Sequence, residues 1–439
     1  MTSLAAIGIL GCVILLTLLL LSVPVGFALM LVGAVGFAAV TGNPASAYHL
    51  LVSVTYENLS KYDLSVIPLF IFMGQIAFHT GISRRLFDAA YRWLGALPGG
   101  LILATMTACI GFGAVCGSGP ASAATMTAVA MPEMRRRKVS LETGAGIVAA
   151  GSSLGILIPP SVVVIVYAII TENSPARLFA ASILPSIVVS AMFLGYIVLL
   201  CMRHPELCPP AQEHFTWKER WFALLNIGEI LILFVVVMAG MLLFGWFTPT
   251  EAAAVGAGGS LLIAVCRRSL TWKALRLALQ ETIRTSTMVL IIVTGALIFG
   301  RFLALTGLTF DIAEILTVTP LPVWAKMGVI MLFFIISGCF VDALALVMLT
   351  MPIFLPVIKA LHYDTVWFGI MVVLLVQLGV ITPPVGVNVY VVSGIERGVP
   401  MERIFKRALP FAGIILIGAI LLTLFPDLAL ALPRLLYSK

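Results

Sequence analysis

The sequence predicts an all-α polytopic membrane protein with about ten spans and two re-entrant helical hairpins. Three observations predict this fold class. The 439 residues are 61% hydrophobic and only 10% charged, with a mean hydropathy of +1.14. This leaves too little charge to cover a soluble surface of that size. Long apolar runs recur along the whole chain, and motifs of the first half recur in the second half in the same order.

Ten apolar runs have the length that crosses a bilayer as an α-helix, which is about 20 residues. In chain order the predicted spans are Ser3–Leu21, Pro24–Val40, Leu64–Phe78, Gly144–Ile170, Leu178–Cys201, Phe222–Phe244, Pro249–Cys266, Ser286–Leu305, Val366–Gly394 and Phe405–Leu424. The first run has no basic segment or small-residue cleavage site around it, so we expect it to be a retained span. A polar linker, Met202–Arg220, separates the two halves.

Two further apolar segments, residues 99–134 and 323–358, are too long for one crossing. Each carries a small or polar patch in its middle, "CGSGPAS" in the first and "SGCFVDA" in the second. Irregular backbone at membrane depth is tolerated only where protein or water satisfies it. We therefore predict two hairpins that enter and leave the membrane on the same side, with their tips buried in protein.

The basic residues predict the orientation of the chain. When the mouth of the first hairpin is placed in the cytoplasm, most of the 26 Lys and Arg residues fall in cytoplasmic loops. Cytoplasmic loops are normally enriched in these residues, so the positive charge is explained without nucleic-acid binding. Both termini are then expected on the periplasmic side, and the second hairpin opens to the outside.

The two halves of the chain match each other at nearly constant spacing. The matching pairs are Pro24 and Pro249, "MGQIAFHTG" (73–81) and "FGRFLALTG" (299–307), "GSGPASAATMTAVAMP" (117–132) and "SGCFVDALALVMLTMP" (337–352), and "LGILIPP" (154–160) and "LGVITPP" (378–384). Each half holds five crossings and one hairpin, and an odd number of crossings inverts the second half. Such inverted-topology repeats are typical of secondary transporters. We assign residues 1–205 to the first repeat, 206–221 to a cytoplasmic linker and 222–439 to the second repeat.

Adjacent prolines interrupt one span of each half, residues 144–170 and 366–394. Proline lacks an amide hydrogen and clashes with the preceding turn, so both spans should be broken helices. The carbonyl groups expected to lose their helical partners are those of Gly155, Ile156, Gly379 and Val380. A cation is a suitable partner for bare carbonyls that line a cavity.

The hairpin tips carry small and hydroxyl-bearing residues that can complete an oxygen-rich shell for a hard cation. These residues are Gly117, Ser118, Ser122, Ser337 and Gly338. A single proline kink is more often a packing feature. Two kinks related by the repeat, each with a matching hairpin, favour cation sites instead.

Asp342 is the acidic residue of the second hairpin tip. A carboxylate at the bilayer centre costs roughly 2.5 to 3.5 kcal/mol on insertion scales, which makes it a functional candidate. The motif match pairs Asp342 with Ser122, so the second cation site should bear a charge and the first should be neutral. Alternatively, Asp342 caps the helix after the hairpin turn. Both roles can hold together.

Two other charged residues have competing explanations. Glu251 follows Thr248 by three residues, with Pro249 at the first helical position, so we predict a capping box there. Arg301 is paired by the repeat with Gln75 and lies near the outer end of its span. The sequence leaves open whether Arg301 snorkels to water or faces an anionic substrate.

At these motifs the chain resembles a known family. "GSGPASAATM", "LGILIPPS", "FTPTEAAAVG", "VDALALVMLTMP" and "QLGVITPPVGVN" resemble motifs of the large membrane (M) subunit of TRAP transporters, the tripartite ATP-independent periplasmic carriers of prokaryotes. The resemblance implies a sodium-driven importer of organic acid anions, such as C4-dicarboxylates or sialic acid, in the bacterial inner membrane. It implies an elevator-type ion transporter fold and two partners: a small four-helix membrane (Q) subunit and a periplasmic substrate-binding (P) protein.

The resemblance also implies where ions and substrate bind. One sodium ion would sit among Gly117, Ser118, Ser122, Gly155 and Pro159. A second would sit among Ser337, Gly338, Asp342, Gly379, Thr382 and Pro383. Substrate would lie between the tips near Ser153, Ser161, Thr382 and Asn388, which are chosen by location alone. Apart from two or more coupling sodium ions, no cofactor is expected.

Other function classes fit the sequence less well. Residues 151–155 match the G-x-S-x-G pattern of hydrolases. That pattern is weak in a helix rich in Gly and Ser, so no enzymatic activity is expected. A passive channel would not need two oppositely oriented hairpins. A stand-alone sodium- or proton-coupled dicarboxylate symporter would share the repeats and broken helices, and it stays the alternative, with Asp342 as the candidate proton carrier.

Overall fold

The computed structural model describes residues 3–21, 23–204 and 215–437. These residues form helices and turns without any strand, as the sequence predicts. Seven of their helices are long and apolar enough to cross a membrane. Six of these correspond to predicted spans, and the seventh is an arm of the second hairpin. The other four predicted spans are two shorter apolar helices and two helices broken at the diprolines.

The helices of the first half are α1 (Ser3–Leu20), α2 (Val25–Thr41), α3 (Pro44–Leu59), α4 (Val66–His79), α5 (Ile82–Leu94), α6 (Gly100–Cys116), α7 (Gly119–Arg136), α8 (Leu141–Ser153), α9 (Val162–Ile170) and α10 (Pro175–Arg203). Those of the second half are α11 (Trp217–Leu242), α12 (Pro249–Cys266), α13 (Trp272–Thr306), α14 (Leu308–Val318), α15 (Val323–Gly338), α16 (Ala343–Ala360), α17 (Thr365–Gly379), α18 (Val387–Ile395), α19 (Met401–Leu424) and α20 (Asp427–Tyr437). Two 3-10 turns, Tyr62–Ser65 and Leu154–Ile156, lie among the helices of the first half.

The succession of elements recurs from one half to the other. Each half contains a two-helix hairpin (α6–α7, α15–α16), a broken helix (α8–α9, α17–α18) and a long helix after it (α10, α19). In both halves a glycine with left-handed backbone, Gly81 at φ +77° and Gly307 at φ +73°, begins the short helix before the hairpin. One difference is that α13 is a single helix where the first half has α3 and α4.

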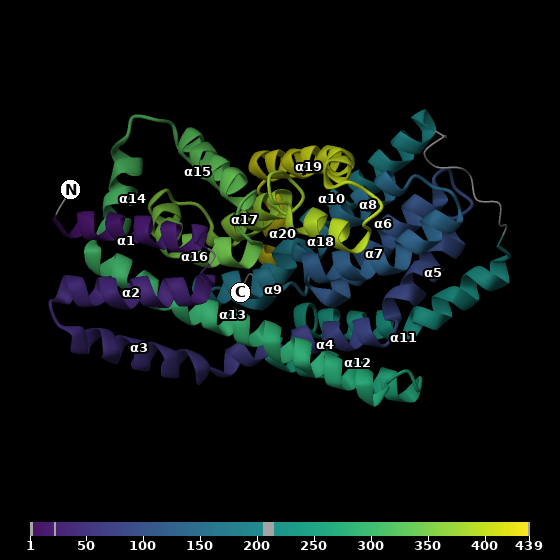
Figure 1. Ribbon diagram of the computed structural model, residues 1–439, viewed down its shortest axis with the longest axis horizontal. Coiled ribbons are helices and arrows are strands. Elements are labelled where there is room, and N and C mark those ends of the chain that lie inside the picture. The colour runs from purple at the N-terminus through teal and green to yellow at the C-terminus, as the bar shows by residue number, and fades with distance from the viewer. Residues whose placement is uncertain (1–2, 22, 205–214, 438–439) are drawn as a thin grey trace.

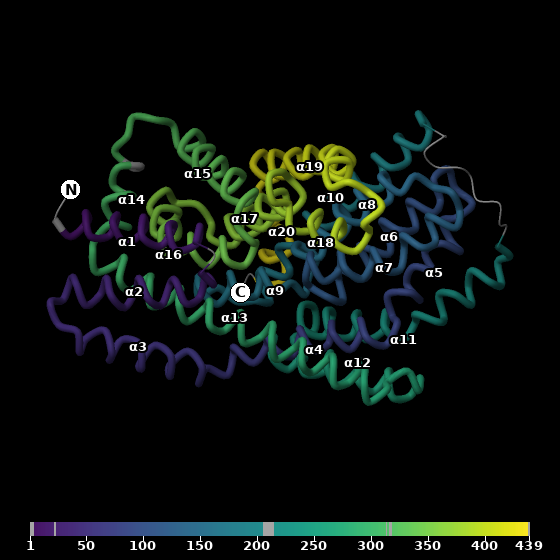
Figure 2. The backbone as a smooth tube through the Cα atoms, viewed as in Figure 1, coloured from purple at the N-terminus to yellow at the C-terminus, as the bar shows by residue number. Residues whose placement is uncertain are grey.

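One edge of the molecule is a layer of scaffold helices that interleaves both halves. Figure 1 shows α2, α3, α4, α12 and α13 along this edge. Helix α2 packs along α13, and α4 packs along α12, so each contact joins the two halves (Figure 2). Small residues permit the close approach. A Cβ at Gly33 of α2 would lie 2.8 Å from the backbone nitrogen of Phe299 in α13.

The hairpins and broken helices form the other layer. Within it, helices of one half pack on helices of the other half. Helix α18 of the second half packs on hairpin helix α7 of the first, and α9 of the first packs on hairpin helix α16 of the second. Helix α8 packs on both α7 and α19. The parts of the chain that the motifs single out therefore form one contiguous body.

The linker assignment needs a correction at its end. Helix α11 begins at Trp217, inside the predicted linker 206–221. Thr216 accepts a hydrogen bond from the Glu219 amide, and the Glu219 carboxylate accepts one from the Thr216 amide at 2.7 Å, so a capping box starts the helix within polar sequence. Residues 205–214 of the linker lie outside the described residues.

The capping box predicted at the start of α12 is confirmed. Thr248 Oγ1 accepts a hydrogen bond from the Glu251 amide at 3.3 Å, and Glu251 Oε2 accepts one from the Thr248 amide at 2.8 Å. We expect Thr248→Ala to lower the free energy of unfolding by about 1 kcal/mol, because it removes the cap. Thermal unfolding of purified protein in detergent measures this. Thr17→Ala is the control, since Thr17 Oγ1 only bonds the carbonyl of Val13 in its own helix. An equal loss in both variants would contradict the prediction.

Candidate functional site

A cavity of about 660 Å³ lies between the two hairpin tips and the scaffold. The first tip lines it with residues 117–121, the second tip with residues 342–345, and the scaffold with the start of α2, the middle of α4 and residues 285–292 of α13. This volume is in the range of small-molecule sites. Among the described residues that line the cavity, Asp342 is the only charged one, and the polar side chains are those of Gln75, Ser118, Thr285 and Thr287.

The first hairpin tip contacts the first helix break closely and is hydrogen-bonded to it. Helix α6 ends at Cys116, and Gly117 turns the chain with φ +64°. A Cβ at Gly117 would lie 2.4 Å from the carbonyl oxygen of Pro160, so this position requires glycine both for its backbone and for its contact. The Gly117 carbonyl accepts a hydrogen bond from the Val162 amide at 3.3 Å. Ser118 occupies the N-cap position of α7 but makes no side-chain capping bond, which leaves its hydroxyl available at the cavity.

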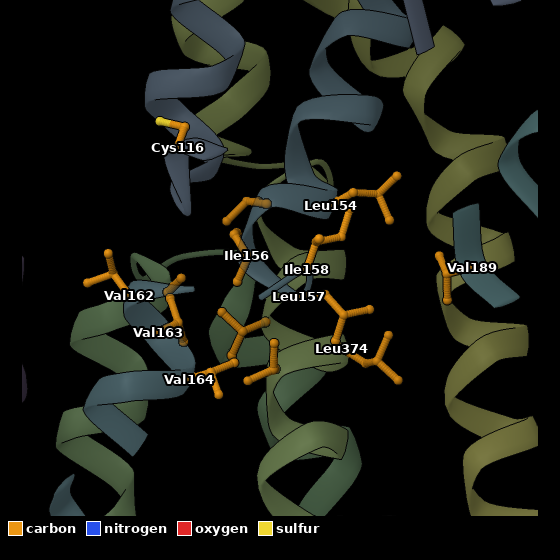
Figure 3. Packing of buried hydrophobic residues seen from close by; sticks show 14 of the residues in the cluster. Cys116, Leu154, Ile156, Leu157, Ile158, Val162, Val163, Val164, Val189 and Leu374 are labelled. Atoms are coloured by element: carbon orange, nitrogen blue, oxygen red, sulfur yellow. The ribbon is translucent and has the colours of Figure 1, made fainter. Parts of the chain in front are cut away.

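The first break is tightly packed against the first hairpin. Helix α8 ends at Ser153 and α9 begins only at Val162. A Cβ at Gly113 of α6 would lie 3.0 Å from the Cα of Gly155, so the two backbones touch. Figure 3 shows Leu154, Ile156, Leu157 and Ile158 of this break packed among the side chains of α9 and Leu374 of α17.

Most residues of the first predicted sodium site come together here. Ser122 is fully buried, and its Oγ lies beside the Cys116 thiol without a nitrogen or oxygen partner among the described residues. It lies beside Gly155, where a Cβ would be 3.4 Å from Ser122 Oγ. Gly117 and Ser118 lie at the tip of the same hairpin, and Pro159 is buried in the break. An unpartnered buried hydroxyl is a group that an ion or water commonly satisfies.

The second tip and break contact each other in the same way. Helix α15 ends at Gly338, and α17 ends at Gly379. A Cβ at Gly379 would lie only 2.2 Å from the carbonyl oxygen of Gly338. Ser337, half-buried, precedes this contact. Asp342 is the N-cap of α16, and its Oδ2 accepts a hydrogen bond from the Leu344 amide at 3.1 Å while the residue stays open to the cavity. The capping role of Asp342 is thus present.

The pairing of Asp342 with Ser122 is wrong by one helical turn. Ser118 is the N-cap of α7 and Asp342 is the N-cap of α16, so these two residues occupy matching positions. Leu346 then stands where the first half has Ser122. The hairpin motifs look alike in either alignment because they are rich in Ala and Met. Each hairpin also touches its break through glycine backbone, Gly113 with Gly155 and Gly338 with Gly379.

The expectation of bare carbonyls is also wrong for three of the four groups. Ser161 Oγ donates to the carbonyl of Ile156 at 2.5 Å. In the second break, the amide of Thr382 donates to Gly379 at 3.1 Å, and the amide of Asn388 donates to Val380 at 3.0 Å. Ser161 and Asn388 follow their diprolines, where the chain folds back, whereas Thr382 precedes Pro383 and closes a local turn on Gly379. A carbonyl oxygen has two lone pairs, so one hydrogen bond still leaves a position for a cation.

The predicted substrate residues lie behind the cavity wall. Ser153, Ser161 and Asn388 are fully buried, and none of them lines the cavity. Thr382 is half-buried, and its hydroxyl donates to the carbonyl of Leu378 at 2.7 Å. Pro383, of the second predicted sodium site, is exposed and lies outside the cavity lining. The roles assigned to these residues stay predictions.

The scaffold wall of the cavity was missed by sequence reasoning. Thr285 and Thr287 line the cavity from α13, and Gln75 lines it from α4. The polar run from Thr285 to Thr287, near the start of an apolar span, could have indicated this wall of the cavity. Arg301 does not line the cavity. It forms an ion pair with Glu57 of α3 at 3.0 Å and is half-exposed.

Comparisons with known proteins agree with this architecture. Residues 12–428 match the family described as "Tripartite ATP-independent periplasmic transporter, DctM component". A C4-dicarboxylate TRAP transporter large permease protein of Pseudomonas aeruginosa is 34% identical over 397 residues, covering 89% of this chain and 91% of that protein. A sialic acid TRAP transporter large permease protein of Vibrio cholerae is 29% identical, covering 96% of this chain and 97% of that protein.

A solved structure shares the fold at much lower sequence similarity. The YdaH transporter of Alcanivorax borkumensis, described as having an unusual topology, superposes with a TM-score of 0.64 at 15% identity, covering 88% of this chain and 90% of that one. The family match extends over nearly the whole chain, including both hairpins and both breaks. The chain therefore belongs to the DctM family of tripartite ATP-independent periplasmic (TRAP) transporters and is a large permease (M) subunit.

Proposed function

We propose that this subunit imports organic acid anions together with sodium ions. The observation that carries the proposal is the cavity that both hairpin tips share, with Asp342 as the one charged side chain among its described lining residues. No Lys or Arg is among those residues, so an anion in this cavity needs positive charge from another source. Bound sodium ions supply it, and the N-terminal turns of α7 and α16, which both line the cavity, add the positive ends of their helix dipoles.

This charge arrangement gives a physical reason for coupling. An anion beside the Asp342 carboxylate is repelled until a cation neutralises that group. Sodium binding therefore precedes or accompanies anion binding. Membrane potential adds about 2.3 kcal/mol for each charge moved across 100 mV. Two sodium ions accompanying one monoanion make import electrogenic.

The proposed ion sites follow the two tips and breaks. The first sodium site comprises Gly117, Ser118, Ser122, Gly155 and Pro159. The second comprises Ser337, Gly338, Asp342, Gly379, Thr382 and Pro383. The proposed substrate residues are Ser153, Ser161, Thr382 and Asn388. Because three of these four are buried, they would act on the substrate only after the tips move.

The proposed movement is of the elevator type. The hairpins, the broken helices, α10 and α19 would move as one body against the remaining predicted spans, which correspond to α1, α2, α4, α11, α12 and α13. The contacts of α18 with α7 and of α9 with α16, which hold this body together, support the division. The halves 1–205 and 222–439 would be inverted repeats, with both termini periplasmic in the bacterial inner membrane. The recurring succession of elements supports this topology.

The proposed substrates and partners come from the family. Relatives are named for C4-dicarboxylates, sialic acid and isethionate, which are all organic acid anions. We infer that this chain carries a member of the same class. It would do so with a small four-helix membrane subunit and a periplasmic substrate-binding protein.

Transport in proteoliposomes tests the proposal. The complex with its small subunit is reconstituted, the binding protein is added outside, and uptake of labelled succinate and N-acetylneuraminate is measured. We expect uptake with external sodium, and loss of uptake when choline replaces sodium at fixed pH. Uptake that persists in choline but follows a pH gradient would indicate proton coupling. Uptake without the binding protein would indicate a stand-alone symporter.

A further inference from the structure

Side-chain hydrogen bonds join the two broken helices directly, and one of them links matching positions of the two halves. Gln377 Nε2 of α17 donates to Ser153 Oγ of α8 at 3.2 Å, and both residues are fully buried. Ser153 directly precedes the "LG" of "LGILIPP", and Gln377 directly precedes the "LG" of "LGVITPP". The two residues therefore occupy matching positions in the two halves. For halves related by a two-fold rotation, matching residues touch where the axis passes between them, so this bond crosses the centre of the repeat.

A second amide strengthens the same link. Asn388 Nδ2 of α18 donates to the carbonyl of Ala149 in α8 at 3.1 Å, and Asn388 is fully buried. Gln377 stands before the second break and Asn388 stands after it. The second break is thus bracketed by two side chains that both bind the last turns of α8. Any shift of the second break pulls on the residues that lead into the first.

Each end of this link lies next to a proposed ion site. Ser153 is two residues before Gly155, which touches the first hairpin at Gly113 and lies beside Ser122. Gln377 is two residues before Gly379, which touches the second hairpin at Gly338. A continuous path of packed backbone and one hydrogen bond therefore runs from one hairpin to the other.

The two amides are poor choices for a role in packing alone. Gln377 Oε1 and Asn388 Oδ1 are buried and have no hydrogen-bond partner among the described residues. Unpaired buried oxygens are destabilising, and an aliphatic side chain would fill the same space without that penalty. Their side-chain nitrogens donate hydrogen bonds that fix the second break relative to α8. This positioning explains why amides occupy the two sites.

We propose that Gln377 and Ser153 are positioning residues that make the binding of the two sodium ions cooperative. This rests on the proposed sodium coupling and adds to it. When the first break closes on an ion, the Ser153–Gln377 bond holds the second break in its binding geometry, and the effect is reciprocal. Gln377 needs no contact with an ion or the substrate to have this effect.

The test is the sodium dependence of uptake by the reconstituted complex with Gln377→Leu. We expect the Hill coefficient for sodium to fall from about 2 towards 1, and half-saturation to require about two- to tenfold more sodium. The KM for substrate at saturating sodium should stay unchanged. Tyr167→Phe is the matched control. It removes another bond between the halves, from Tyr167 Oη to the carbonyl of the half-buried Thr365 at 2.6 Å, at the far end of α17 from the break.

The outcomes separate this inference from the proposed function. A Gln377→Leu complex with wild-type cooperativity overturns the inference, as does an equal loss of cooperativity in Tyr167→Phe. If Gln377→Leu does not fold, Gln377→Met removes the donor with a smaller change of side-chain shape. Sodium-dependent thermal stabilisation in detergent then gives the same Hill analysis without transport. If wild-type uptake ignores sodium altogether, the proposed function itself fails, and the inference fails with it.

Discussion

Replacing Asp342 by asparagine should abolish sodium-dependent uptake. Asparagine caps a helix about as well as aspartate, so the start of α16 is preserved and only the charge is removed. A cation that loses a charged ligand loses roughly 3 kcal/mol of binding free energy. This lowers the affinity for the ion by about 100-fold. We expect uptake at physiological sodium to fall by at least that factor, measured in proteoliposomes against equal amounts of folded protein.

The chain offers a matched control for this change. Asp364 is the N-cap of α17 and accepts hydrogen bonds from the amides of Val366 at 2.7 Å and Trp367 at 3.3 Å. It does not line the cavity. Asp364→Asn should therefore leave uptake within about twofold of the wild type. Full uptake by Asp342→Asn would remove this carboxylate from the coupling site, and equal losses in both variants would assign the effect to capping.

Sequence patterns predicted the parts of the fold that rest on apolar length and proline chemistry. Helices α8 and α17 both end a few residues before their diprolines, because proline cannot continue a helix whatever the tertiary context. The hairpins followed from their length and from small residues at their centres. Helix α5 was missed because its apolar residues occupy only one face, with Arg84 and Arg85 on the helix as well. The mean hydropathy of such a helix is too low for it to be predicted as a membrane span.

The errors at the site arose where tertiary contacts decide the outcome. Motif similarity alone placed Asp342 opposite Ser122, whereas the N-cap positions of α7 and α16 pair Asp342 with Ser118. The carbonyl of Ile156 was expected to be bare because the return path of the chain, which brings Ser161 to it, is not visible in a helix-period pattern. The cavity wall from α13 combines residues more than 160 positions from the first tip, and no local pattern reveals such a combination.

Glycine at the contact between the second hairpin and its break is the remaining strict requirement of the site. Gly379→Ala places a Cβ 2.2 Å from the Gly338 carbonyl oxygen, and the obstructing atoms are backbone. Helix α15 must then move away from α17. Forcing extra volume into a packed contact costs about 1 to 3 kcal/mol. We expect a lower melting temperature and complete loss of uptake, because the second break can no longer hold its hairpin.

The neighbouring glycines turn this into a graded prediction. A Cβ at Gly155 would meet the Cα of Gly113 at 3.1 Å, so Gly155→Ala needs a shift of only a few tenths of an ångström and should reduce uptake partially. Gly394 of α18 has open space around it, and alanine is favoured over glycine in a helix by about 1 kcal/mol. Gly394→Ala should therefore keep full uptake and melt no lower than wild type. Uptake and melting curves of the three variants check this order, in which Gly379→Ala is the most harmful, Gly155→Ala is intermediate and Gly394→Ala is harmless. If Gly379→Ala transported normally, the contact between the second hairpin and its break would have no part in the cycle, and the two tips could not work as matched halves of one site.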